Sequence, residues 1–172
     1  MRVLVTGGTG FVGCHSVAAL VSQGHQVRLL VRSRDQVARS LSPLGVADVE
    51  SVVGDVTAPQ SVEEAMAGCD AVLHAAAVYS TDPRAASRVR ETNPRAAEIV
   101  LGAAVRMGLD PVVHVSSYTA LLPPQPPDAV LTPDSPVTRP AGAYSRSKAE
   151  SDQVARRYRE QGAPGDRLPR EG

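Results

Sequence analysis

The sequence has no tryptophan, one phenylalanine and only two cysteines, and its 18 basic side chains are balanced by 18 acidic ones. Cys14 and Cys69 are far apart and not in metal-ligand spacing, so we expect neither a disulfide scaffold nor a zinc site. Zero net charge argues against a nucleic-acid partner, because proteins that bind phosphates along a strand carry a basic excess. No apolar run approaches the roughly 20 residues that span a bilayer, so we expect no membrane partner.

A chain of 172 residues is long enough for one domain with a hydrophobic core. Its N-terminus passes from Met1 and Arg2 directly into a strand-like apolar segment, from which we expect no signal peptide. These features predict a soluble, cytoplasmic globular domain.

Short β-branched runs alternate along the chain with longer, Ala-rich amphipathic stretches. Strands are predicted over residues 2–6, 27–31, 49–53, 71–74 and 112–116, and helices over residues 11–22, 61–67, 94–107 and 144–158. Ser61 is the expected N-cap of the second helix, and Gly108 is the expected C-cap of the third. This alternation is typical of a parallel sheet covered on both faces. Right-handed crossovers then predict an α/β fold with a doubly wound, Rossmann-type sheet of about five parallel strands. Residues 123–140 are rich in proline and predict an extended loop.

A glycine-rich turn follows the first predicted strand and opens the first helix, with glycines at Gly7, Gly10 and Gly13. In such a turn the first glycine permits a tight bend, the second lets the backbone approach a pyrophosphate, and the third allows close packing. The helix N-terminus adds positive potential for the phosphates. A flexible loop is the alternative interpretation, but the position between strand and helix favours dinucleotide binding.

The end of the second predicted strand indicates which dinucleotide binds. An acidic residue there hydrogen-bonds the ribose 2′-hydroxyl of NAD, whereas arginine accommodates the 2′-phosphate of NADP. The sequence places Arg32 at this point, with Arg34 in support and no acid at the strand end itself. NADP is therefore favoured over NAD, although surface arginines often follow strands and Asp35 could bend back to the ribose.

Tyr144 and Lys148 are four residues apart on a predicted helix and therefore share one face. At an effective dielectric of about 20 and a separation of about 4 Å, an ammonium stabilises a phenolate by about 4 kcal/mol. That interaction would lower the tyrosine pKa from about 10 to near 7, a suitable value for general acid–base chemistry on alcohols and carbonyls. Ser116 and Ser117 end a predicted strand at the ligand-binding edge, where a hydroxyl can bind the substrate oxygen. A chance surface pair and turn-capping serines are the alternative interpretations.

Taken together, these motifs resemble those of extended short-chain dehydrogenases/reductases. The similarity is to the NAD-dependent epimerase/dehydratase type, which includes 3β-hydroxysteroid dehydrogenases and dihydroflavonol reductases. The matching segments follow family order over about residues 1–161: 6–13, 54–56, 74–77, 91–93, 113–117 and 144–148. The resemblance implies an NAD(P)-dependent oxidoreductase, or an epimerase or dehydratase, that moves a hydride between nicotinamide and a substrate alcohol or carbonyl. It also implies a small-molecule substrate and is compatible with a homodimer.

The resemblance further implies roles for individual residues. Ser117, rather than Ser116, orients the substrate oxygen, Tyr144 transfers the proton, and Lys148 tunes Tyr144 and holds the nicotinamide ribose. The implied cofactor-binding positions are Gly7, Gly10, Phe11, Val12 and Gly13 in the turn, Arg32, Asp55 and Val56 at the adenosine, Ala75, Ala76 and Ala77 along the cofactor, Asn93 as a support from a helix, and Lys148. Arginine after the second strand resembles the NADP-using reductases and departs from the acid of NAD-using epimerases.

Residues 162–172 depart from the family pattern, which continues into a sixth strand ending in a Tyr-Pro-Gly-like motif and then into a substrate-binding region. Their composition is that of an irregular tail. A one-nucleotide shift of the reading frame over residues 165–170 permits Ala-Thr-Val-Tyr-Pro-Gly. We therefore expect a dinucleotide-binding domain over residues 1–161 without the sixth strand and substrate domain, followed by a truncation or frameshift remnant. The alternative function is a dinucleotide-binding fragment or redox-sensor module without turnover.

Overall fold

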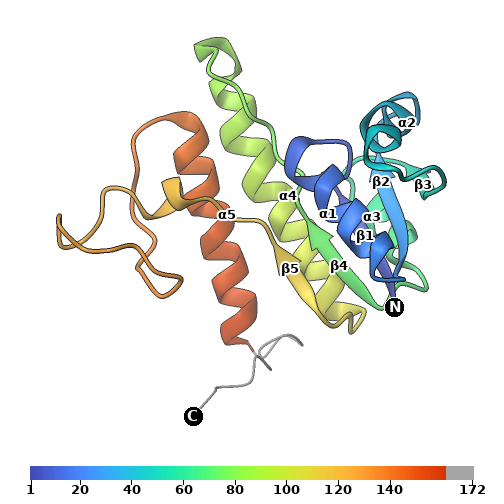
Figure 1. Cartoon of the computed structure of the whole chain (residues 1–172). Helices are drawn as coiled ribbons and strands as arrows, with labels where there is room; N and C mark the ends of the chain where they lie inside the picture. The colour runs from blue at the N-terminus through green and yellow to red at the C-terminus, as the bar shows by residue number, and fades with distance from the viewer. Residues whose placement is uncertain (162–172) are drawn as a thin grey trace.

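The computed structural model of the protein describes residues 1–161. Five parallel strands form one sheet in the order β3-β2-β1-β4-β5 (Figure 1). The strands are β1 (Arg2–Thr6), β2 (Gln26–Val31), β3 (Glu50–Val53), β4 (Ala71–His74) and β5 (Val112–His114). The helices are α1 (Phe11–Ser22), α2 (Asp35–Leu41), α3 (Pro59–Met66), α4 (Ala86–Arg106) and α5 (Ala143–Glu160), with 3₁₀ turns η1 (Ser42–Leu44), η2 (Pro83–Ala85) and η3 (Tyr118–Leu121). Strand order reverses direction at β1, which confirms the predicted doubly wound sheet.

Side chains of the central strand β1 alternate between two hydrophobic cores. Leu4 packs on one face of the sheet in a cluster with Val62 of α3 and Val100 of α4. Val5 packs on the opposite face in a cluster with Val17 of α1. Because helices cover both faces, the central strands carry apolar side chains on both sides, and this produces the nearly continuous apolar runs in the sequence.

The largest difference from the sequence prediction is the start of α4, which lies at Ala86 rather than at residue 94. Proline is favoured in the first turn of a helix, where its missing N–H needs no partner. This preference is the reason why the sequence predicts that the helix starts at residue 94. Pro94 instead lies inside the helix, directly after the buried Asn93. Burial of side chains in the turn before Pro94 stabilises the longer helix and offsets the roughly 3 kcal/mol that an interior proline costs.

Other differences concern one further helix and several element ends. The sequence predicts no helix where α2 lies, and β5 ends at His114 rather than at residue 116. Ser61 is not an N-cap, because α3 begins at Pro59 with Ala58 in the capping position. Gly108 has the left-handed backbone (φ +71°) expected just after the end of α4. Residues 122–142 form the predicted extended loop, which projects away from the sheet in Figure 1.

The last two long helices pack against each other through Ala97 and Leu101 of α4 and Val154 of α5. Within residues 1–161, none of the helices combines the length and apolar character that crossing a membrane requires. The tail expected over residues 162–172 lies outside the described residues.

Candidate active site

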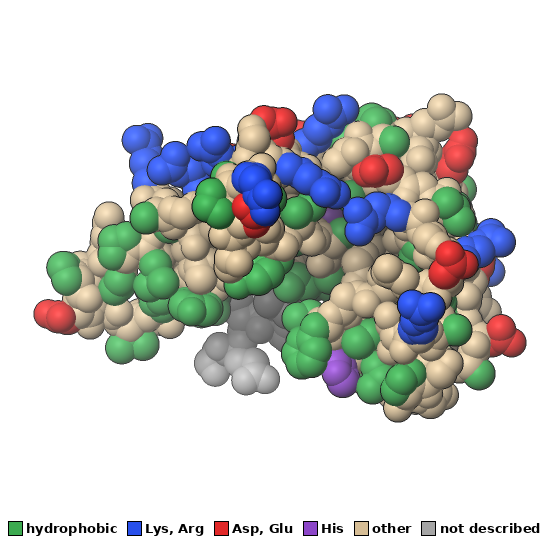
Figure 2. Space-filling model, turned by 90° about the horizontal axis from the view of Figure 1, so that it is seen from above, with side chains coloured by type: hydrophobic (Ala, Val, Ile, Leu, Met, Phe, Trp, Pro, Cys, Tyr) green, Lys and Arg blue, Asp and Glu red, His purple; other side chains and the backbone are tan. Residues whose placement is uncertain are grey.

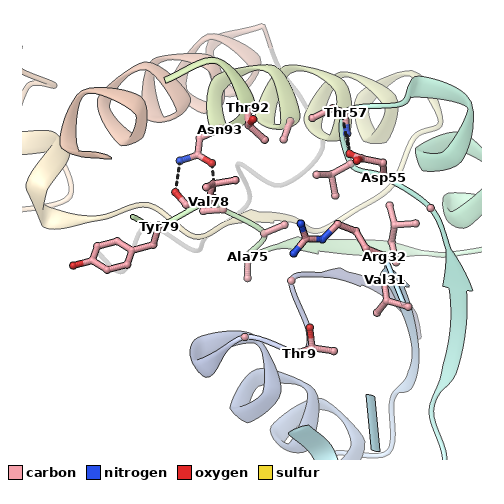
Figure 3. A pocket seen from close by; sticks show the side chains of 18 of the residues that line it. Thr9, Val31, Arg32, Asp55, Thr57, Ala75, Val78, Tyr79, Thr92 and Asn93 are labelled. Atoms are coloured by element: carbon pink, nitrogen blue, oxygen red, sulfur yellow. Dashed lines mark hydrogen bonds between the residues drawn. The ribbon is translucent and has the colours of Figure 1, made fainter. Parts of the chain in front are cut away.

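A cavity of about 540 Å³ opens at the carboxyl edge of the sheet, where the loops after β1, β2, β3 and β4 meet α4 (Figure 3). Most of the predicted cofactor-binding residues line it, namely Gly7, Gly10, Arg32, Asp55, Val56, Ala75, Ala76, Ala77 and Asn93. Phe11, Val12, Gly13 and Lys148 are not among its lining residues. The edge of a doubly wound sheet where strand order reverses is the usual ligand crevice of such folds.

The glycine turn brings the backbone of two strands into close approach. Gly7 has φ +72°, and a Cβ there would lie 2.6 Å from the backbone nitrogen of Ala76. A Cβ on Gly13 would lie 2.1 Å from the carbonyl oxygen of Gly7, so α1 packs directly on the turn. Phe11 and Val12, by contrast, point outward and are 83% and 53% exposed. Glycine is therefore required at Gly7 by both contact and conformation, and at Gly13 by contact alone.

The N-terminus of α1 fits a pyrophosphate. Its N-cap is Gly10, no side chain caps its first turn, and that turn contains no acidic residue. The first N–H groups of the helix are thus free of competing side-chain acceptors and lie beside the positive end of the helix dipole. These features suit the phosphates of a dinucleotide.

Arg32 and Asp55 stand on neighbouring walls of the cavity, and the Arg32 guanidinium points into it (Figure 3). Oδ1 of Asp55 accepts hydrogen bonds from the backbone N–H (2.8 Å) and the hydroxyl (2.7 Å) of Thr57. These two bonds, followed by the nearby Arg32 and Arg88, hold the pKa of Asp55 below its ordinary value. Asp55 is therefore a fixed carboxylate, available to the adenine end of a nucleotide.

The neighbours of Arg32 are directed elsewhere. Arg34 donates to the backbone oxygen of Ser51 at 3.2 Å and does not line the cavity, so the structure does not place it in support of Arg32. Asp35 begins α2 and accepts a 3.0 Å hydrogen bond from Ser33. It too is absent from the cavity lining, so Arg32 is the charged residue that the end of β2 contributes.

Asn93, on α4, connects the cavity wall to α5. Its Oδ1 accepts from the backbone N–H of Val78 (2.7 Å), and its Nδ2 donates to the Val78 oxygen (3.0 Å) and to Ser147 Oγ on α5 (2.9 Å). The first two of these bonds are drawn in Figure 3. With 3% exposure, Asn93 is a buried brace between the β4 loop, α4 and α5.

The predicted catalytic residues gather beside this brace. Tyr144 lies in the first turn of α5, and Ser117 caps η3 by accepting a hydrogen bond from the backbone N–H of Thr119. Ser117 lies close enough to Tyr144 to lower the pKa of the phenol. Lys148 is 4% exposed, and its Nζ donates a 2.6 Å hydrogen bond to the backbone oxygen of Val115. Tyr79 both lines the cavity and contacts Tyr144. The cavity and the Ser–Tyr–Lys group are therefore adjacent.

The electrostatics of Tyr144 differ from the sequence prediction. Burial and the nearby Tyr79 raise the pKa of Tyr144 above its ordinary value, and the opposing effect of the neighbouring Ser117 is smaller. Burial lowers the pKa of Lys148, whose ammonium is held by Val115. Helical spacing places Tyr144 and Lys148 on one face, but the hydrogen bond to the β5 loop decides where the ammonium lies. The large depression of the phenol pKa that spacing predicts is thus absent.

Two histidines, the buried His74 and the half-buried His114, lie within electrostatic range of Lys148. His74 Nδ1 shares a 2.7 Å hydrogen bond with the hydroxyl of Thr6, and the rings of His74 and His114 are 5.4 Å apart. Both ring nitrogens of His114 are buried without a partner among the described residues. Burial lowers the pKa of His74 to about 3 and of His114 to about 4, with Lys148 adding to both shifts. Both rings are therefore neutral near pH 7.

Sequence reasoning missed several cavity residues: Thr9, Gln36, Thr57, Arg88 and Thr92. Arg88 and Thr92 are spaced by four with Ala96 on α4, a pattern that would have revealed them had the helix been extended beyond its proline. No comparable signal marks Gln36, whose helix went unrecognised. No group of three or more His, Cys, Asp or Glu side chains within residues 1–161 is arranged to hold a metal.

A doubly wound parallel sheet, a glycine turn between β1 and α1, and a cavity at the strand-order reversal define a Rossmann-type nucleotide-binding domain. Residues 3–164 match the NAD dependent epimerase/dehydratase family, and the chain belongs to that family.

Individual relatives agree with this assignment. The chain is 35% identical over 154 residues to a 4-hydroxy-2-methyl-3-oxo-4-farnesyl-3,4-dihydroquinoline-1-oxide ketoreductase from Stigmatella aurantiaca, covering 90% of this chain and 45% of the relative. It is 35% identical over 173 residues to a dTDP-glucose 4,6-dehydratase from Streptomyces niveus, covering 90% and 48%. A short-chain dehydrogenase/reductase superfamily protein from Agrobacterium tumefaciens, solved with bound NAD, superposes with a TM-score of 0.78 at 30% identity, covering 95% and 47%. The chain thus spans about half the length of the relatives it matches.

Proposed function

We propose that this chain binds NADP(H) and carries the proton-transfer residues of an oxidoreductase acting on an alcohol or carbonyl of a small molecule. The observation that carries the proposal is the contact of Tyr79, a cavity-lining residue, with Tyr144. Because of this contact, the predicted dinucleotide site lies next to the predicted proton donor, Tyr144. Epimerase or dehydratase activity through a transient oxidation would use the same residues.

A bound nicotinamide supplies the hydride acceptor or donor. In the reduction direction, the carbonyl carbon gains the hydride and the carbonyl oxygen gains the phenolic proton of Tyr144, while Ser117 donates a hydrogen bond to that oxygen. Lys148, whose Nζ is held by the Val115 oxygen, would bind the nicotinamide ribose. The same steps in reverse oxidise an alcohol.

The phosphates would lie at Gly7 and Gly10 and at the start of α1, and the adenosine near Asp55 and Val56. Ala75, Ala76 and Ala77 would run along the dinucleotide, and Asn93 would brace the wall behind it. Support comes from the close approach of Gly7 to Ala76 and from the uncapped first turn of α1. The roles of Phe11, Val12 and Gly13 rest on the family pattern, with Gly13 acting through packing.

NADP is proposed over NAD because Arg32 points into the cavity and the end of β2 contributes no acid to it. Titration of the full chain with NADPH and NADH, followed by nucleotide fluorescence, tests this preference. We expect tighter binding of NADPH and loss of that preference in Arg32→Ala. Tighter binding of NADH by the unmodified chain would contradict the assignment.

The catalytic proposal is tested with Tyr144→Phe. We expect the substitution to reduce turnover by about 10²- to 10⁴-fold, the usual contribution of a general acid, with dinucleotide binding unchanged. Tyr118→Phe is the matched control, because Tyr118 is 69% exposed. Unchanged turnover in Tyr144→Phe would exclude the catalytic role. Dinucleotide binding by an unmodified chain that lacks turnover would instead favour a binding fragment or sensor module.

The family resemblance also supports a cytoplasmic location and a homodimer, which we propose to involve α4 and α5. Light scattering after size-exclusion chromatography tests the dimer, and cell fractionation tests the location. A monomeric mass at micromolar concentration would contradict the first proposal.

A further inference from the structure

The first turn of α4 contributes a charged side chain to the cavity. Arg88, Thr92 and Ala96 all line it and are spaced by four residues, so one face of α4 forms a continuous wall. Arg88 is at the end of this wall closest to the start of the helix at Ala86. It belongs to the segment that the sequence prediction left outside the helix.

Arg88 faces the same space as Arg32 but comes from a different wall. The charged residues lining the cavity are Arg32, Asp55 and Arg88. Asp55 is already engaged by the two hydrogen bonds from Thr57. Within residues 1–161, neither Arg32 nor Arg88 forms a side-chain hydrogen bond or a salt bridge, in contrast to Arg28. The cavity therefore has a net positive charge and two uncommitted guanidinium groups.

Both guanidinium groups lie within electrostatic range of the Asp55 carboxylate, since each lowers its pKa. Seen from above, basic side chains border the hollow near the centre of this face of the molecule (Figure 2). A pyrophosphate is already provided for by the glycine turn and the start of α1. Two further cations at the adenosine end exceed what NAD requires.

We propose that Arg88 is a second specificity-determining residue, which binds the 2′-phosphate of the dinucleotide from α4 while Arg32 binds it from β2. The inference rests on the proposed function, because it assumes a dinucleotide in this cavity. A phosphate monoester has a second pKa near 6 and carries roughly two negative charges at neutral pH. Guanidinium groups suit it because each donates forked hydrogen bonds to phosphate oxygens.

The experiment compares NADPH and NADH binding by the full chain, its Arg88→Ala variant and its Arg90→Ala variant. Arg90 is a matched control, because it is an exposed arginine on the same helix that does not line the cavity. We expect Arg88→Ala to weaken NADPH binding roughly tenfold, the loss of about one charge-assisted hydrogen bond, and to leave NADH binding nearly unchanged. Arg90→Ala should change neither affinity.

The probes 2′-AMP and 5′-AMP separate the two phosphate positions, with a loss expected only for 2′-AMP. Equal weakening of NADPH and NADH would overturn the inference, because Arg88 would then bind a part common to both. Unchanged NADPH affinity in Arg88→Ala would overturn it as well. Arg88→Gln, which keeps much of the side-chain length, provides the same comparison if the alanine variant does not fold.

Binding of NADPH and NADH by the unmodified chain separates the role of Arg88 from the dinucleotide site itself. An unmodified chain that binds neither NADPH nor NADH contradicts the dinucleotide site itself. An unmodified chain that prefers NADPH and keeps its preference without Arg88 contradicts only the role of Arg88.

Discussion

The ring of Tyr79 meets the ring of Tyr144 edge to face, with centroids 4.9 Å apart and planes at 84°. Tyr79 is 70% exposed and follows β4 at the cavity, whereas Tyr144 belongs to the far helix α5. Aromatic pairs of this geometry are attractive beyond their buried area, by about 0.5–1.5 kcal/mol. The pair therefore fixes the proposed proton donor against the wall of the proposed cofactor site.

Replacing Tyr79 with alanine should lower the pKa of Tyr144. Burial and the neighbouring Tyr79 both raise that pKa, and the substitution removes the second cause and part of the first. Carbon-13 NMR of ring-labelled tyrosines, followed over pH, measures the shift. Tyr118→Ala is the control and should leave the Tyr144 titration unchanged. A Tyr144 pKa that stays constant or rises in Tyr79→Ala would contradict this account.

Alanine at Gly7 should destabilise the fold more than alanine at Gly24. Both glycines have positive φ, +72° and +79°, but only Gly7 has backbone atoms within 3 Å of the added Cβ. We expect a loss of about 1 kcal/mol at Gly24 from conformation alone, and about 3 kcal/mol or more at Gly7. Urea unfolding of the two variants measures the difference. Equal losses would show that the turn relaxes away from Ala76.

Acid should destabilise the protein through His74, which is buried, and His114, whose ring nitrogens are buried. Their folded-state pKa values, about 3 for His74 and about 4 for His114, lie below the 6.5 of a free histidine. The unfolded chain thus binds more protons below pH 6.5, and the free energy of unfolding falls as the pH drops from there toward 4. Each histidine should contribute a slope of about 1.4 kcal/mol per pH unit in this window.

The variant His114→Gln should remove about half of that slope, as measured by urea unfolding at several pH values. His15→Gln is the matched control, because His15 is exposed on α1. A slope that His114→Gln leaves intact would mean that other groups cause the acid sensitivity.

Asn93→Ala should cost about 2 kcal/mol of stability, because it leaves the backbone amide and carbonyl of the half-buried Val78 without their side-chain partner. Ser147→Ala should cost less, since it removes a single contact with Asn93 and a 2.7 Å bond to the Tyr144 carbonyl. A double-mutant cycle in urea should show a coupling energy of about 1 kcal/mol between the two positions. Strict additivity would exclude an energetic link between them.

The sequence predicts the central sheet and the glycine turn well. Buried strands appear as short apolar runs, and the backbone at Gly7 has a positive φ and a close contact that only glycine accommodates. Strand β1, helix α1 and strand β4 have the predicted bounds. Helix α2 was missed because Leu41 is its only buried residue, and so it has almost no apolar periodicity. The boundary of α4 was missed because burial of the turn before Pro94 outweighs the local preference of proline.

The candidate site shows the same limit. Spacing alone could bring Tyr144 and Lys148 to one helix face, but Ser117 caps η3 three residues beyond the end of β5 rather than ending the strand. The orientation of the Lys148 ammonium depends on the Val115 oxygen, which lies 33 residues away in the chain. The contact of Tyr79 with Tyr144 likewise joins elements distant in sequence. Burial and the contact with Tyr79 raise the pKa of Tyr144, and no local sequence pattern encodes either of them.

The three hydrogen bonds of Asn93 have a thermodynamic consequence. They connect Val78, on the cavity wall, to Ser147, which lies between Tyr144 and Lys148 on α5. If a ligand at the cavity stabilises Val78 and this stabilises α5, then by reciprocity a change that destabilises α5 weakens ligand binding by the same free energy. Ligand affinity at the cavity and the stability of α5 around the proposed proton donor would thus be coupled through the side-chain amide of Asn93.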